Sequence, residues 1–484
     1  MQLFERSTEI DRLALLLERA RATDEVLSLQ VKLAWYLRQC DNVRAQQLAA
    51  WASAQLVAEP GNAVTQALRA RLMLVGAETL WLLSEFEQAV AAAQTAMAMF
   101  QTLGDFAGCA DSQGILVSVY SSSGDLAQRD GCLDLAVENA TLANDTQRID
   151  YFEANKARYA ALRDVRRSSA QWRQRFPEDL AHSHPGVAAS VYAYFGARDY
   201  NTGNFGGALE RQNLAFEAAV QSGQLVSAVV AAVNAGGTYV VLNDHDAALE
   251  WLQRGLDLAR PTGWAVTLGP CLRQMGEVMR AMGRLDAAQS LLDEALRVYE
   301  PLRNSRNFAM VLTALGDLAQ TKGDYPTALD LFRQQAERAK QLAQTDAAIE
   351  GHIGIATALL HLGQDDEAED SAATALRLAQ DQGAVLQEVT ALRLLSRIHG
   401  GRGDRVTAMT CLEQALNTAR TVEGYLIPSE LLFALADEYA KAGRYDDAYT
   451  MAIQANTARE RVLNQEASNR ATAIQVRLGT ERSR

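Results

Sequence analysis

Few residues of this 484-residue chain have the types and spacing that chemistry requires. His182 and His184 form a His-x-His pair, a spacing that can ligate a metal ion. The pair lies in a proline-containing stretch without a nearby cysteine or acidic cluster, so we predict no metal there. The acidic stretch GQDDEAED at 363–370 lacks the twelve-residue spacing of a calcium loop. We interpret it as a hairpin turn followed by the solvated N-terminus of a helix.

The five cysteines are the remaining candidates for reactivity. Cys271 and Cys411 lie on predicted helices near arginines, which can lower the pKa of a thiol. The alternative, which we favour, is that both are small buried hydrophobic residues. The cysteines are far apart and form no C-x-x-C pair, and no phosphate-loop, dinucleotide-binding or zinc-protease motif is present. We therefore predict a protein that is not an enzyme and needs no cofactor.

Composition narrows the fold and the partners. Only 8 prolines and 32 glycines, with abundant Ala, Leu, Gln and Glu, are typical of a nearly all-helical protein. The formal net charge of −13 disfavours nucleic acid as a partner, because an acidic surface repels phosphate. The longest apolar run, at 227–242, is too short to span a membrane, and residues 1–30 show no secretory signal. We expect a soluble, cytoplasmic protein.

A repeat of forty residues organises most of the chain. The segments that begin at residues 282, 322, 362, 402 and 442 align without a gap. One alanine and, five residues before it, one turn glycine recur in this register. The alanines are Ala208, Ala248, Ala288, Ala328, Ala368, Ala408 and Ala448; the glycines are Gly203, Gly283, Gly323, Gly363, Gly403 and Gly443, with Asn243 in the remaining unit.

A second small position marks where two helices approach each other. It contains Gly196, Gly236, Gly276 and Gly316, twelve residues upstream of the recurring alanine. Two small positions separated by a glycine turn are what two antiparallel helices need for close contact. Each unit is therefore predicted to be a helical hairpin, and we count eleven from residue 23, of which the unit at 150–185 is degenerate. Residues 7–22 precede them as a capping helix, with Ser7 or Thr8 as its N-cap.

These motifs resemble the tetratricopeptide repeat. The likeness is complete in GARDYNTGNFGGALE and LGDLAQTKGDYPTALD, which carry the small residue, the Gly-Asp/Asn-aromatic turn and the alanine of that family. The period is forty rather than thirty-four, as in the longer-helix variants of maltose-regulator-type activators. The resemblance implies an all-α, right-handed solenoid superhelix with a concave groove. It divides the chain into a capping helix at 1–22, a solenoid at 23–462 and a linker helix from 463 to 484.

The resemblance also implies which residues face the groove. In this family one face of each first helix points inward, and longer-period relatives use an asparagine there to grip a peptide backbone. Asn155 and Asn234 occupy that position, although Asn234 could instead bond a neighbouring helix. We predict that the groove binds a peptide, a protein or a small amphipathic ligand. The predicted binding residues are Tyr151, Asn155, Arg158, Tyr194, Asn234, Arg273, Gln274, Glu277 and Asp317.

The C-terminal stretch LNQEASNRATAIQVRLGTERSR carries an apolar stripe at helical spacing, formed by Leu463, Ala467, Ala471, Ile474 and Leu478. It resembles the segment that joins tetratricopeptide sensor regions to output domains in bacterial diguanylate cyclases and histidine kinases. This resemblance implies a sensor region whose output domain would follow residue 484, with a homodimer formed through the last helix. The alternative is a stand-alone scaffold or adaptor in which the helix only caps the solenoid.

Overall fold

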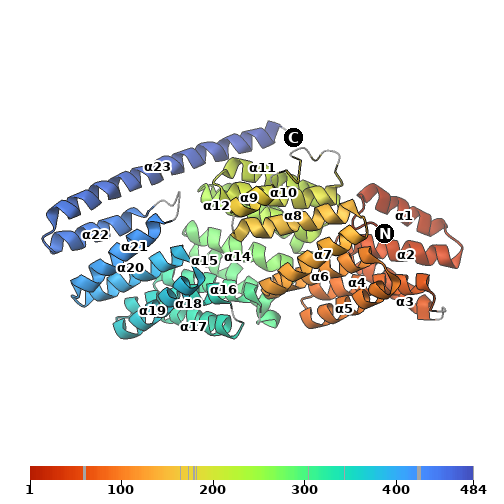
Figure 1. Ribbon diagram of the computed structural model, residues 1–484, viewed down its shortest axis with the longest axis horizontal. Helices are drawn as coiled ribbons and strands as arrows, with labels where there is room; N and C mark the ends of the chain where they lie inside the picture. Colours follow the sequence, from red (N-terminus) through yellow and green to blue (C-terminus); the bar gives the residue numbers. More distant parts are fainter. Residues whose placement is uncertain are drawn as a thin grey trace. The chain divides into compact units, whose positions relative to one another are not determined.

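The computed structural model describes residues 1–57, 61–163, 165–172, 174–177, 180, 183–303, 305–342, 344–421 and 427–482. Within these residues the chain contains helices and no strand, which confirms the predicted all-α fold (Figure 1). The α-helices are α1 (Ser7–Arg19), α2 (Thr23–Leu37), α3 (Asn42–Val57), α4 (Ala63–Leu82), α5 (Phe86–Leu103), α6 (Phe106–Ser123), α7 (Leu126–Leu142), α8 (Thr146–Arg163), α9 (Val165–Trp172), α10 (Pro185–Asn201), α11 (Phe205–Gln221), α12 (Leu225–Val241), α13 (His245–Ala259), α14 (Ala265–Ala281), α15 (Leu285–Tyr299), α16 (Arg306–Lys322), α17 (Tyr325–Gln341), α18 (Thr345–His361), α19 (Asp365–Gln382), α20 (Val385–Gly401), α21 (Arg405–Arg420), α22 (Ser429–Lys441) and α23 (Tyr445–Arg482).

Helices α2 to α23 form eleven consecutive hairpins in the described part of the chain, as the repeat predicts. The even-numbered helices are the first helices of these hairpins, and several contact the first helix of the next hairpin, as α2, α4, α6, α8 and α10 do. The chain divides into two compact units. Unit 1 contains residues Met1–Gln274 and Thr472–Arg484, and unit 2 contains Met275–Ala471.

The recurring alanine lies where the two helices of a hairpin meet. Ala248, Ala288 and Ala328 are completely buried, and Ala408 is nearly so. The turn before the alanine needs a left-handed backbone conformation, with φ near +78° at Gly323 and +58° at Asn243. The recurrence of the alanine and the turn residue every forty residues therefore follows from the geometry of the hairpin.

The second small position also has its predicted role. A Cβ atom added to Gly236 would lie 2.7 Å from Leu252 Cγ, and one added to Gly276 would lie 2.7 Å from Leu292 Cγ. Real Cβ atoms do not come this close to a neighbour, so only glycine allows the two helices of these hairpins to pack at this distance.

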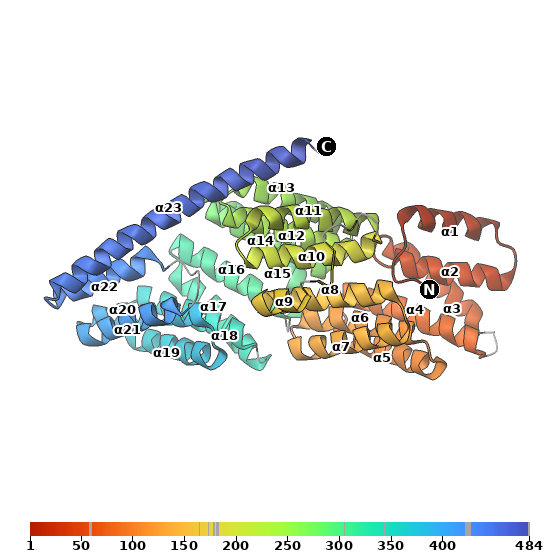
Figure 2. The ribbon, with the colours of Figure 1, turned by 45° about the horizontal axis from the view of Figure 1, so that its top comes forward.

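The N-terminal end of the chain differs in detail from the sequence expectations. Helix α1 ends at Arg19, and its N-cap is Arg6, which makes no side-chain cap hydrogen bond, so the prediction of Ser7 or Thr8 as N-cap is wrong. The residues before α1 are held in place by distant helices, and this fixes where the helix starts. Helix α23 is one continuous helix of 38 residues, so no break occurs at 463 (Figure 2). No helix in the described residues is both long enough and apolar enough to cross a membrane.

Candidate binding face

The first helices of unit 1 already hold a non-helical piece of chain, the residues before α1, which bends at Leu3. Leu3 and Phe4 are only 4% and 5% exposed, although they belong to no helix. Figures 1 and 2 place the N-terminus beside α2. We call these side chains around residues 1–5 the cradle: Trp35 on α2, Arg38 at the C-cap of α2, Gln147, Arg148 and Tyr151 on α8, and His184 before α10.

The cradle grips this segment mainly through its backbone. Arg148 Nη2 donates to the Met1 carbonyl oxygen at 3.0 Å, and Trp35 Nε1 donates to the Gln2 carbonyl oxygen at 3.1 Å. Arg38 Nη2 donates to the Leu3 carbonyl oxygen at 3.4 Å. In the other direction, the Leu3 amide donates to Gln147 Oε1 at 3.1 Å. Three successive carbonyls and one amide are thus satisfied by side chains.

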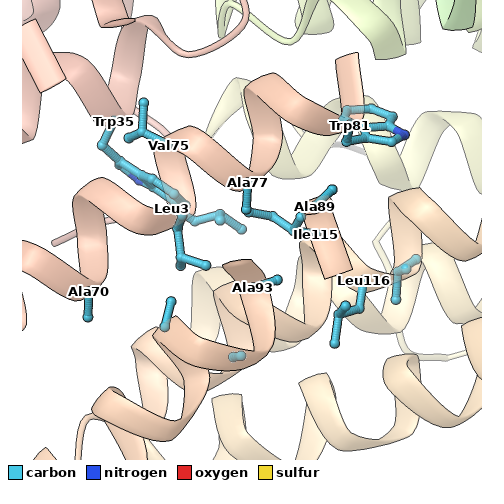
Figure 3. Packing of buried hydrophobic residues seen from close by; sticks show 14 of the residues in the cluster. Leu3, Trp35, Ala70, Val75, Ala77, Trp81, Ala89, Ala93, Ile115 and Leu116 are labelled. Carbon is cyan, nitrogen blue, oxygen red and sulfur yellow. The ribbon is translucent and has the colours of Figure 1, made fainter. Parts of the chain in front are cut away.

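Two side chains of the segment are buried in the cradle. Leu3 belongs to the hydrophobic cluster that contains Trp35 and Val75 (Figure 3). The Phe4 ring meets the Tyr151 ring edge-on with centroids 5.0 Å apart, and it stacks on His184 at 6.5 Å. A Cβ atom added to Gly186 would lie 2.5 Å from Phe4 Cδ2, so a glycine is required at this contact.

A buried ionic network fixes the central donor of the cradle. Arg148 donates to Asp111 Oδ1 at 2.8 Å and to Oδ2 at 2.7 Å, and its Nη1 lies 2.5 Å from Asp145 Oδ2. Arg71 contacts the same Asp111 carboxylate. Burial acts to raise the pKa of Asp111, but Arg148 and Arg71 together hold that pKa below its usual value. Asp111 is therefore ionised and orients both arginines.

A second ion pair fixes Arg38. Its Nε donates to Glu78 Oε2 at 2.6 Å, and its guanidinium carbon lies 3.9 Å from the centroid of the Trp35 ring. Gln39 also donates to Glu78, at 2.5 Å. Because α4 supplies Glu78, while Trp35 lies on α2 and Arg38 and Gln39 lie in the turn after it, two adjacent hairpins position this donor.

The predicted binding residues of α8 lie at the cradle and beside it. Tyr151 contacts Phe4, and burial raises the pKa of its phenol to about 12. Asn155 donates to the Tyr151 carbonyl oxygen at 2.9 Å and to Ser190 Oγ at 3.4 Å, while Arg158 donates back to Asn155 Oδ1 at 3.3 Å. The Asn155 amide is thus satisfied within the protein, whereas Arg158 Nε has no hydrogen-bond partner in the described residues.

Tyr194 requires a correction. It was predicted on the inward face of α10, but it is 1% exposed and packs against Phe176, with ring centroids 5.9 Å apart. Phe176 belongs to the connection between α9 and α10, which joins the same hydrophobic cluster as Tyr194. Phe176 covers the Tyr194 ring, so Tyr194 is part of the core.

The predicted residues of α12 and α14 are more accessible. Asn234 is exposed, and no side-chain hydrogen bond links it to another described residue. Gln274 is half-buried and lies across α12, because a Cβ atom added to Gly237 would meet its Nε2 at 2.8 Å. Arg273 is also half-buried. Asn234 and Gln274 thus place two side-chain amides on neighbouring first helices.

Glu277 and Asp317 belong to unit 2 and form part of a negatively charged patch. Burial raises the pKa of Asp317, Arg280 opposes this increase, and the Glu277 carboxylate adds to it. The pKa of Glu350 on α18 is also raised, first by burial and then by nearby carboxylates that include Asp317 and Glu277.

The histidines and cysteines considered for metal or thiol chemistry do not lie in environments that favour it. His182 lies outside the described residues. His184 accepts a hydrogen bond from the Gly186 amide at 3.1 Å, and burial together with Arg6 lowers its pKa to about 4. Cys271 is completely buried, which raises the pKa of its thiol to about 12 and makes it a poor nucleophile. Within the described residues no cluster of three metal-ligating side chains occurs.

Sequence reasoning missed most of the cradle. Trp35, Arg38, Gln147 and Arg148 were not predicted as binding residues, because their common partner is a segment up to 147 residues away in the chain. One signal was present: the pair Leu3–Phe4 precedes the first helix without any helical periodicity of its own. A buried apolar pair outside a helix needs a surface to cover it.

Comparisons with known proteins agree with the fold. Residues 270–341 match the tetratricopeptide repeat family. Among curated proteins, none matches the chain. A Rap protein complexed with Competence and Sporulation Factor is similar over 82% of this chain and 99% of its own, with a TM-score of 0.51 and 13% identity. The apo form of the quorum sensor NprR from B. thuringiensis is similar over 73% and 99%, with a TM-score of 0.52 and 15% identity. At these identities the likeness shows the fold alone.

Proposed function

We propose that this protein is a non-enzymatic regulatory binding protein of the cytoplasm, which holds an extended peptide or protein segment on the face of its first helices. The observation that carries the proposal is the cradle, where this face holds a non-helical segment by its backbone. Backbone contacts of this kind serve any extended segment, since every peptide unit presents the same groups. The likeness to a quorum sensor and to a Rap protein bound to a factor supports a regulatory role.

The accessible part of this face surrounds Asn234. A side-chain amide both donates and accepts, so it can pair with a peptide unit as Gln147 pairs with the Leu3 amide. Gln274 and Arg273 on the next first helix of unit 1 extend the row of polar groups.

We expect Asn234→Ala and Arg273→Ala each to weaken ligand binding about tenfold or more, which is roughly the 1.4 kcal/mol of one well-placed hydrogen bond. Peptides selected from a displayed random heptapeptide library against the full chain serve as ligands, and calorimetric titration measures their affinity. Asn417→Ala is the matched control, because Asn417 is an exposed asparagine on α21, a second helix. Wild-type affinity in both face variants would place the binding elsewhere.

The C-terminal helix is the proposed route of the signal and the proposed dimer contact. Leu463 and Ile474 are 54% and 58% exposed, and Ala467 and Ala471 between them are exposed as well. An apolar stripe exposed along a helix gains stability from a partner helix. The fifth residue of the predicted stripe, Leu478, has a side chain outside the described set. A stand-alone scaffold needs no such contact between two copies, so self-association through α23 distinguishes the signalling function from the scaffold function.

Replacing Leu463 and Ile474 together by glutamate should weaken self-association about tenfold or more, because the change puts charges into an apolar contact. Sedimentation equilibrium of the full chain over a range of concentrations measures the effect. The variant Asn464→Glu with Gln475→Glu adds the same charge at neighbouring exposed positions and should change little. If the wild-type chain and both variants sediment alike as monomers, the helix has no role in dimerisation.

A further inference from the structure

We propose that residues 1–5 are an internal ligand, which blocks the cradle until an external peptide of the same chemistry displaces it. This inference rests on the proposed function and adds to it a ligand class and a mode of regulation. The ligand is an extended segment in which an aliphatic residue is followed by an aromatic one, as in Leu3–Phe4.

The contacts of the backbone do not depend on which chain supplies the segment. Arg148, Trp35 and Arg38 donate to three successive carbonyl oxygens, and Gln147 accepts from one amide. All four contacts involve backbone groups, so another peptide that adopts the same bend at its third residue presents them in the same places. A second peptide can therefore replace residues 1–5 without loss of a hydrogen bond.

The donors are also held by groups outside residues 1–5. Arg148 is held by Asp111 and Asp145, and Arg38 is held by Glu78 and the Trp35 ring. These partners lie on α2, α4, α6 and just before α8, so none of them belongs to residues 1–5. The cradle is thus preorganised, which reduces the cost of exchanging one occupant for another.

Two side-chain positions set the specificity. The Leu3 side chain lies in the apolar cluster of α2 and α4, and the Phe4 ring lies between Tyr151, His184 and Gly186. The absence of a Cβ at Gly186 makes room for a flat ring, and the Arg38 guanidinium carbon lies 5.7 Å from the centroid of that ring. An aromatic residue is therefore preferred directly after the aliphatic one.

One unsatisfied group favours an external ligand over the internal one. His184 Nδ1 accepts from the Gly186 amide, which leaves Nε2 as the donor, and Nε2 is buried without a hydrogen-bond partner in the described residues. An external segment that brings an oxygen to this nitrogen gains a hydrogen bond that residues 1–5 do not make. Residues 1–5 thus fill the cradle, but an external segment can form one hydrogen bond more.

The test is binding of a labelled peptide to the full chain. The probe is the fluorescein-labelled hexapeptide Met-Gln-Leu-Phe-Glu-Arg, which has the sequence of residues 1–6, and fluorescence anisotropy measures its affinity. The variant Leu3→Ala with Phe4→Ala empties the two side-chain positions and is expected to bind the probe at least tenfold more tightly than the wild-type chain. The same hexapeptide with alanine in place of Leu and Phe should bind neither.

A matched variant controls for nonspecific effects. Leu386 and Phe433 are an exposed leucine and phenylalanine in unit 2, so replacing both by alanine should leave probe binding at the wild-type level. A folded Leu3→Ala/Phe4→Ala chain that does not bind the probe, or a wild-type chain that binds it equally tightly, overturns the internal-ligand proposal. In either case, library peptides that still bind near Asn234 would leave the proposed function intact.

A second measurement covers the case in which the double variant does not fold. Excess unlabelled hexapeptide is added to the wild-type chain, and hydrogen exchange of the backbone amides in residues 1–6 is followed by mass spectrometry. Displacement exposes the Leu3 amide, which is bonded to Gln147, so exchange should become at least tenfold faster. Unchanged exchange at a saturating peptide concentration would show that the segment is a permanent part of the fold.

Discussion

Replacing Asp111 by alanine is expected to lower the free energy of unfolding of unit 1 by about 3–5 kcal/mol, because removal of one partner leaves buried charges uncompensated. The Arg148 and Asp111 side chains are 0% exposed, and Arg71 is 5% exposed. Without the carboxylate, two buried guanidinium groups face each other. All six tryptophans lie within residues 1–274, so denaturation followed by tryptophan fluorescence reports on unit 1.

The same group predicts a dependence on pH. The pKa of Asp111 in the folded protein lies below its unfolded value, which is about 3.9. Its contribution to stability is therefore fully present above the unfolded pKa and is lost as the pH falls through the folded pKa. The wild-type chain should lose stability in acid from this source, and the Asp111→Ala variant should not.

An exposed aspartate provides the matched control. Asp134 lies 2.6 Å from Lys156, but its side chain is 63% exposed, so Asp134→Ala should cost less than about 1 kcal/mol. An Asp111→Ala variant that unfolds within 1 kcal/mol of the wild type would mean that the network does not support the cradle. Arg148 would then hold the Met1 carbonyl by its own packing alone.

The register of the hairpins could be predicted from the sequence because each small residue has the same structural role in every repeat. Ala328 is buried at a helix contact, and Gly323 supplies the left-handed turn before it. A substitution at either position is costly in every repeat, so the pattern persists along the chain. Local constraints of this kind are visible in sequence without any knowledge of tertiary contacts.

The candidate site was less predictable because its contacts join distant parts of the chain. Gln147 and Arg148 meet residues 1–3, and no periodicity connects the two segments. Tyr194 failed for a related reason: its position in the repeat is that of Asn234, but an irregular connection brings Phe176 over it. A face inferred from a repeat is open only where no other part of the chain covers it.

Asn234 remains a prediction of a different kind. The structure leaves its amide exposed, which is compatible with the role expected from the resemblance, while Asn155, two repeats earlier, bonds Tyr151 and Ser190. The two asparagines therefore separate the gripping role from the self-satisfied alternative. Only a binding measurement can assign the first role to Asn234.

Phe332 should be the most sensitive position of unit 2. This side chain of α17 is 1% exposed, and a Cβ atom added to Gly316 or Gly354 would lie 2.7 Å or 2.5 Å from its ring. Phe332→Ala leaves a cavity between α16 and α18 and is expected to cost about 3–5 kcal/mol. Gly354→Ala should cost about 1–3 kcal/mol in the wild-type chain, because the methyl group would overlap the ring.

The double variant distinguishes overlap from any intrinsic effect of the glycine. With the ring removed, the methyl group of Gly354→Ala enters empty space, so the same change should be neutral or stabilising in the Phe332→Ala chain. The two changes are therefore expected to couple by about 0.5–3 kcal/mol. Gly400→Ala is the control, since its added Cβ would lie 3.8 Å from the nearest atom and alanine is the better helix former.

Far-UV circular dichroism follows unfolding, and tryptophan fluorescence should show unit 1 unchanged. Additive costs would mean that α16, α17 and α18 do not meet at this ring.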